Sequence, residues 1–178
     1  LSSQNVHLII DGLPPGTTIN AKVIHGGFLN IVPVGAPETG QTETFDSSAR
    51  LELTGTGALA GWGRTLNIGG MHCQTQVAPR MPGTSPQSFD TEMFHLQGQL
   101  PPGDPDFDLL RITAGSGFGL PSPGHTTLTK VGGSWTVDSF FDITYRIDFV
   151  GRAGSPFGGR SGSTTGTIRM AQGGTPQV

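Results

Sequence analysis

Residues 135–149, WTVDSFFDITYRIDF, alternate between apolar and polar side chains along the whole stretch. Alternation with a period of two places the two sets on opposite faces of a β-strand. The set that begins with Trp135 is apolar except for Ser139 and faces the core, with Phe141 near its middle. Such a strand would span about 50 Å, whereas strands usually have about 5–6 residues, so we expect a bulge near Ser139. The stretch predicts the main core strand of an all-β protein.

Short alternating runs separated by glycine and proline turns fill the rest of the chain, and no 11-residue window has the periodicity of an amphipathic helix. Gly26-Gly27 and Gly69-Gly70 are typical of hairpin turns. We therefore expect an antiparallel β-sandwich, or a barrel-like sandwich, of about eleven short strands. It forms a single all-β domain over residues 1–178. Residues 1–10 would be a separable N-terminal strand and residues 171–178 a flexible tail.

The composition argues against several partners. The net charge is −3, so the chain lacks the basic surface that nucleic acids require. No stretch has the roughly 18 apolar residues of a transmembrane helix. Charged residues make up 13% of the chain, about half the usual share, and Gly and Thr are frequent, which is typical of exported bacterial β-proteins. Leu1 in place of a methionine fits a processed mature form. We expect a secreted, extracellular or cell-surface protein.

Three carboxylates, Asp104, Asp106 and Asp108, follow one another at every second position. Carboxylate oxygens are calcium ligands, and in an extended segment these three would share one side. Leu109 and Gly115 stand where an EF-hand loop needs glycine and glutamate, so that pattern fails. Two interpretations stay open: another kind of calcium site, or a solvated turn that leads into the next strand. No other cofactor is expected.

The polar face of residues 135–149 carries Asp138, Asp142, Arg146 and Asp148. It is interpreted as an exposed face whose charges discourage edge pairing. The alternative is an interaction surface, or a structural ion pair with Arg111 or Arg169 on a neighbouring strand. No catalytic residues are predicted. His72 and Cys73 are adjacent and point to opposite faces, and Asp90 with Glu92 is a common pattern on exposed strands. The chain is expected not to be an enzyme.

The segments GLPSPGHTTL and DSFFDITYRIDF, with FDTEMFHLQGQL and GSTTGTIRM, resemble an uncharacterised family of exported Gly-rich all-β proteins from planctomycetes and other environmental bacteria. The resemblance covers roughly residues 17–172. It implies export, and it implies no activity and no catalytic residue.

Two functions follow as hypotheses. The first is a structural or interaction protein, a subunit of a homo-oligomer or filament joined by β-strand exchange. Val6, Leu8 and Ile10 would fill a groove of the next subunit, or would close the sheet of their own chain. The alternative is a module that binds carbohydrate or another ligand, with a possible calcium site. Trp62, Trp135 and the acidic loop would then contact the ligand, provided that Trp62 is exposed.

Overall fold

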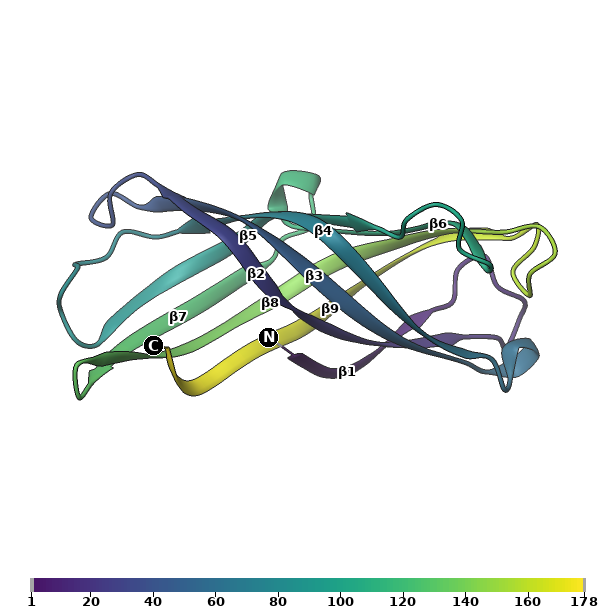
Figure 1. The fold of residues 1–178 in the computed structure, drawn as a ribbon, viewed down its shortest axis with the longest axis horizontal. Coiled ribbons are helices and arrows are strands. Elements are labelled where there is room, and N and C mark those ends of the chain that lie inside the picture. Colours follow the sequence, from purple (N-terminus) through teal and green to yellow (C-terminus); the bar gives the residue numbers. More distant parts are fainter. Residues whose placement is uncertain (1, 178) are drawn as a thin grey trace.

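The computed structural model describes residues 2–177, with the side chains of residues 9–172, and confirms the all-β prediction (Figure 1). The strands are β1 (Ser2–Ile9), β2 (Ile19–Val34), β3 (Gln41–Gly55), β4 (Gly63–Val77), β5 (Gln87–Gln99), β6 (Phe107–Ala114), β7 (Pro123–Val131), β8 (Ser134–Gly151) and β9 (Ser161–Gln177). The helices in this part of the chain are two 3-10 turns, η1 (Gly57–Leu59) and η2 (Ser116–Phe118). Among the described residues, therefore, no helix has the length and apolarity to cross a membrane.

The strands form one antiparallel sheet that closes on itself. Its order is β4-β3-β2-β1-β9-β8-β6-β5-β7, and the additional pairings β4–β5 and β8–β7 complete the circuit. Both β6 and β7 lie between β5 and β8: β6 pairs with the C-terminal part of each, and β7 with the N-terminal part. The two sides of an elongated closed sheet thus enclose the core (Figure 1).

The described residues form nine strands, fewer than the eleven expected, because two expected turns lie inside strands. Gly26-Gly27 belongs to β2 and Gly69-Gly70 to β4, and the pairing register shifts beside each pair. Gly27 and Gly70 have φ values of 65° and 62°. Glycine adopts this left-handed conformation at little cost, and here it makes a bulge instead of a turn. The hairpin prediction was wrong at both pairs.

The two ends of the chain are part of the sheet. β9 pairs with β8 as far as Gln177, opposite Trp135, so residues 171–177, for which a flexible tail was predicted, lie in a strand. In β1, Val6 and Leu8 pair with β2 of the same chain. Their side chains lie outside the described set, and Ile10 follows β1 with an exposed side chain.

The core strand predicted at residues 135–149 is β8, which runs from Ser134 to Gly151. From Phe141 to Phe149 every second residue is buried, and the register with β9 shifts between Val137 and Ser139, where a bulge was expected. Trp135 is half-buried. The sequence pattern therefore gave both the inward face and the irregular point of β8 correctly.

Candidate functional site

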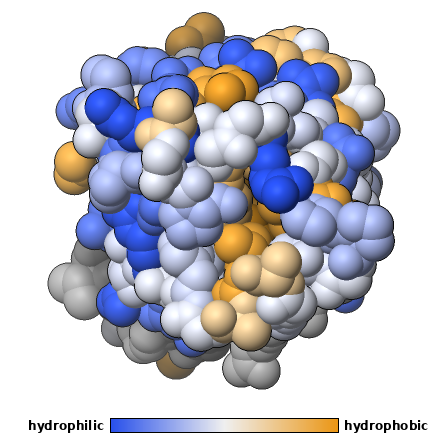
Figure 2. Space-filling view, turned by 90° about the vertical axis from the view of Figure 1, so that its right-hand side faces the viewer, coloured by the Kyte–Doolittle hydropathy of each residue, from blue (hydrophilic) through white to orange (hydrophobic). Residues whose placement is uncertain are grey.

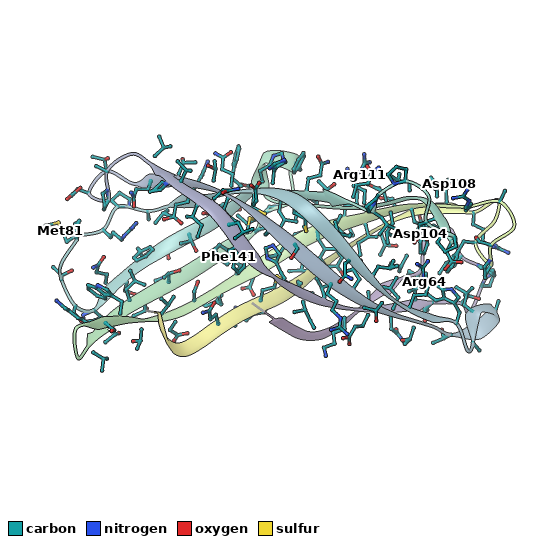
Figure 3. The ribbon with its side chains drawn as sticks, viewed as in Figure 1. Arg64, Met81, Asp104, Asp108, Arg111 and Phe141 are labelled. Atoms are coloured by element: carbon teal, nitrogen blue, oxygen red, sulfur yellow. The ribbon has the colours of Figure 1, made fainter. Side chains whose placement is uncertain are left out.

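A chamber of about 270 Å³ lies inside the closed sheet, in the half that carries the 78–86 loop. In Figure 3, Phe141 lies midway along the sheet and Met81 lies at the end of this half. Half of the residues that line the chamber are apolar, and four of these are phenylalanines. Its lining residues are His25, Phe28, Glu43, Phe45, Thr75, Val77, Arg80, Phe89, Thr91, Met93, Thr126, Leu128, Ser139 and Phe141.

His25, at the inner end of this chamber, belongs to a buried polar chain. Its Nε2 lies 2.7 Å from Ser47 Oγ, which lies 3.2 Å from Cys73 Sγ. Burial lowers the pKa of His25 to about 4, so the imidazole is neutral at pH 7. Burial also raises the pKa of Cys73 to about 11, which leaves the thiol protonated and unreactive. His25, Ser47 and Cys73 therefore form a neutral hydrogen-bonded cluster in the interior.

Three polar atoms of the chamber wall are buried and have no hydrogen-bond partner among the described residues. They are His25 Nδ1, Thr91 Oγ1 and Arg80 Nη1. An unsatisfied buried polar atom costs about 1–3 kcal/mol, so native proteins rarely leave one without water or a ligand. Three of them around one chamber provide hydrogen-bonding positions beside its phenylalanine rings.

A second cavity, of about 40 Å³, extends the interior beyond His25. It is lined entirely by β-strand side chains, among them Val23, Ala114, Ile143 and Ile168. Tyr145 also lines it, and burial raises the pKa of this phenol to about 12. His25 lines both this small cavity and the larger chamber.

The opposite half of the sheet is filled by packing. Phe107, Phe149 and Phe157 are buried and contact one another, and the rings of Phe107 and Phe157 are 4.8 Å apart. The Trp62 ring packs edge-on against Phe157, with centroids 4.9 Å apart. Figure 2 looks onto this end, where apolar surface shows between polar side chains. Because Trp62 is half-buried in this cluster, it does not offer the exposed face that sugar stacking requires.

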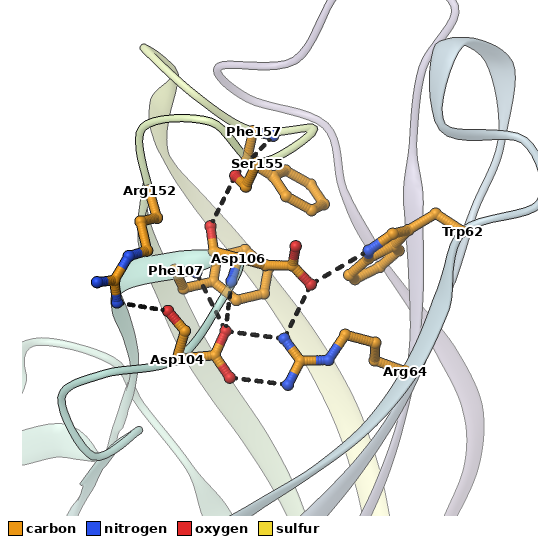
Figure 4. A network of polar contacts seen from close by, with 8 residues as sticks. All are labelled: Trp62, Arg64, Asp104, Asp106, Phe107, Arg152, Ser155 and Phe157. Atoms are coloured by element: carbon orange, nitrogen blue, oxygen red, sulfur yellow. Dashed lines mark hydrogen bonds and ion pairs between the residues drawn. The ribbon is translucent and has the colours of Figure 1, made fainter.

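The predicted calcium loop lies at this packed end and holds a guanidinium (Figure 4). Arg64 forms a bidentate pair with Asp104, with both N–O distances 2.8 Å, and its Nη1 lies 2.8 Å from Asp106. Trp62 Nε1 donates to the same Asp106 oxygen at 3.3 Å. The hydrogen bonds from Arg64 hold the pKa of Asp104 below its usual value.

The Arg64 guanidinium lies between the carboxylates, in the position that a calcium ion would take. Asp104 Oδ1 also accepts the backbone N–H groups of Asp106 and Phe107, and Asp108 is exposed. Within the described part of the chain, no three His, Cys, Asp or Glu side chains are grouped to hold a metal. The structure thus has an ion pair at the loop for which calcium binding was one interpretation. Sequence spacing missed it because Arg64 is 40 residues from Asp104.

The polar face of β8 forms cross-strand ion pairs. Asp142 and Arg169 of β9 are bidentate, at 2.7 and 2.6 Å, and the hydrogen bond from Arg169 lowers the pKa of Asp142. Arg146 bonds to Asp148 at 3.3 Å, as does Arg111 of β6 at 3.1 Å. The ion pairs expected with Arg111 and Arg169 are thus present. Asp138 is exposed, and its interaction role stays a prediction.

An unexpected Ser-His-Asp chain lies on the outer face of β5 and β7. Ser88 Oγ is 2.7 Å from His125 Nε2, and His125 Nδ1 is 2.8 Å from Asp90. Ser88 and Asp90 lie two positions apart on β5 and so share one face of the strand. Asp90 is the residue of β5 that pairs with His125 of β7. The Asp90 side chain is 85% exposed, and neither Ser88 nor His125 lines a cavity described above. The geometry resembles a nucleophile set, but it lacks the enclosed site that makes such hydrogen bonds catalytically useful.

No family model, curated protein or solved structure matches this chain. The resemblance to exported planctomycete proteins therefore stays a prediction.

Proposed function

We propose that the chain is a ligand-binding protein that holds one small, mainly apolar molecule in the chamber. The observation that carries this proposal is the pairing of an aromatic wall with three buried, unpartnered polar atoms. Binding sites for small molecules are typically apolar concavities with a few convergent polar groups. Closed sheets of about eight strands have an interior that is either filled by side chains or holds one small ligand. Here one half is filled and the other is not.

The size of the chamber supports a small ligand. An engineered apolar cavity of about 150 Å³ binds benzene, and this chamber has about 270 Å³. A bicyclic aromatic molecule or a medium-length alkyl chain fits that volume. The rings of Phe28 and Phe45, 5.7 Å apart and edge to face, give such a ligand a wall with fixed geometry.

Fluorescence titration with N-phenyl-1-naphthylamine, a neutral probe that brightens in apolar surroundings, tests the proposal. Leu128→Trp puts a larger side chain into the chamber wall. Val131→Trp is its matched control at an exposed position of the same strand. We expect saturable one-to-one binding to the wild type and to Val131→Trp, and at least about tenfold weaker binding to Leu128→Trp. Equal binding to all three proteins, or no saturable binding, would contradict the proposal.

A second candidate function is self-association of an exported subunit, and a different observation favours it. β2 pairs with β1 only as far as Ile24, and the described pairs of the following segment are all with β3. This segment includes four exposed aliphatic residues: Leu29, Ile31, Val32 and Val34. An apolar strand with one unpaired edge is a template for pairing with another chain.

Sedimentation velocity of the wild type, Ile31→Lys and the control Val150→Lys tests this second candidate. Val150 is also exposed, but it lies on β8, which is paired on both sides. Self-association through β2 predicts concentration-dependent growth that Ile31→Lys abolishes and Val150→Lys preserves. If deletion of residues 1–10 abolishes assembly and Ile31→Lys does not, the β1 exchange model takes its place. A wild type that is monomeric at high concentration excludes both.

A further inference from the structure

Arg80 lines the chamber, and one nitrogen of its guanidinium has no hydrogen-bond acceptor among the described residues. Its backbone N–H donates to Pro37 O at 2.7 Å, which anchors the residue to the 35–40 loop. Its guanidinium carbon lies 4.7 Å from the centroid of the Phe89 ring, which also lines the chamber. The Nη1 atom is buried and has no hydrogen-bond partner among the described residues. Stacking on Phe89 thus holds a flat cation against the wall.

A guanidinium in this position favours an anion. Arginine stays protonated at every physiological pH, and its planar fork matches the two oxygens of a carboxylate. Charge-assisted hydrogen bonds are about twice as strong as neutral ones, and low polarity around them increases the difference. Arg80 forms no ion pair among the described residues, in contrast to Arg64, Arg111 and Arg169.

We propose that the ligand is an amphipathic carboxylic acid whose carboxylate binds Arg80 and whose apolar part extends between the aromatic side chains toward His25. This inference rests on the proposed function and adds the chemical class of the ligand. Thr91 Oγ1, the unpartnered hydroxyl in the same wall, donates a further hydrogen bond to a polar group of the ligand. The neutral His25 at the inner end tolerates an apolar tail and can bond a hydroxyl on it.

Glu43 also lines the chamber, and its carboxylate disfavours an anionic ligand. Glu43 and Arg80 are both half-buried, but Arg80 Nη1 is enclosed and has no acceptor among the described residues. A cationic ligand would leave that enclosed donor without an acceptor, and an anionic ligand satisfies it. Glu43 then weakens the binding of the acid by like-charge repulsion. Removal of this charge is expected to strengthen binding.

Calorimetric titration with decanoate, decanol and decylamine separates the possibilities, since the three probes share one alkyl chain. For the wild type we expect decanoate to bind at least about tenfold more tightly than decanol, and decylamine to bind most weakly. Arg80→Met keeps an apolar stem on Phe89 and should remove the preference for decanoate while decanol binding persists. Glu43→Gln should tighten decanoate binding severalfold.

Persistent decanol binding shows that the variant is folded and its chamber intact. Equal binding of decanoate and decanol to the wild type would overturn the acid assignment and leave the apolar chamber standing. Tighter binding of decylamine would assign the charged contact to Glu43 and overturn the proposal. If none of the three probes binds, the proposed function fails together with this inference.

Discussion

The two halves of this closed sheet are built from similar strands, but side chains fill the interior of one half and line a chamber in the other. The half near η1 buries three phenylalanines and half-buries Trp62, and Arg64 forms ion pairs with both Asp104 and Asp106. The other half also supplies aromatic residues, but these line a chamber, and three buried polar atoms without partners belong to its wall. Packing and ion pairing in the first half secure the fold. The second half is consequently the part of the interior that is available to a ligand.

The largest expected effect comes from truncating one phenylalanine in each half and comparing the two losses of unfolding free energy. Phe157 is 0% exposed in the packed cluster, so Phe157→Ala should lower the free energy of unfolding by about 3–5 kcal/mol. Phe141 faces the chamber and already lacks neighbours on one side, so Phe141→Ala should cost about 1–3 kcal/mol. Urea unfolding measures both. Equal losses would show that the two halves are equally well packed.

Acid should weaken the chamber half first. The folded-state pKa of His25 is about 4, against 6.5 as its ordinary value, so between these pH values the unfolded chain binds the extra proton. The wild type should therefore lose stability as the pH falls from 6.5 to 4, by about 3 kcal/mol in total. His25→Gln should lack this loss in urea titrations over the same range. Parallel pH profiles of the two proteins would refute the assignment.

Replacement of Arg64 should lower the free energy of unfolding less than truncation of Phe157, because the Arg64 side chain is partly exposed. Arg64→Met leaves the enclosed carboxylates of Asp104 and Asp106 without a cation, at a cost of about 2 kcal/mol at pH 7. The pKa of Asp104 is lowered, so the stabilisation by this pair is present above pH 3.8 and is lost as the pH falls further. Denaturant midpoints at pH 7 and pH 3 test this. A variant penalty that is independent of pH would argue for lost packing alone.

Chelation should have the smallest effect. Because Arg64 already occupies carboxylate oxygens of both Asp104 and Asp106, EDTA should leave the thermal midpoint unchanged, and added calcium should not raise it. A rise with calcium, abolished by Asp104→Asn, would restore the metal interpretation of this loop.

The sequence predicted the fold class and the inward face of β8 because strand periodicity is local. Local signals failed at Gly26-Gly27 and Gly69-Gly70, since glycine serves a bulge as well as a turn. The chamber could not be predicted. It depends on pairings between distant strands, and no motif links His25, Arg80 and Thr91 in the sequence. The Ser88, Asp90 and His125 set was missed for the same reason, although Ser88 and Asp90 share one strand face.

The most direct test of the difference between the halves is a crystal structure of the protein soaked in bromobenzene, with bromine located by its anomalous scattering. The account predicts one strong peak inside the sheet, in the chamber between Phe28, Phe45 and Phe141. It predicts none in the cluster of Phe107, Phe149 and Phe157. A peak in that cluster, or an empty chamber at saturating bromobenzene, would contradict the claim that the unfilled half is a ligand site.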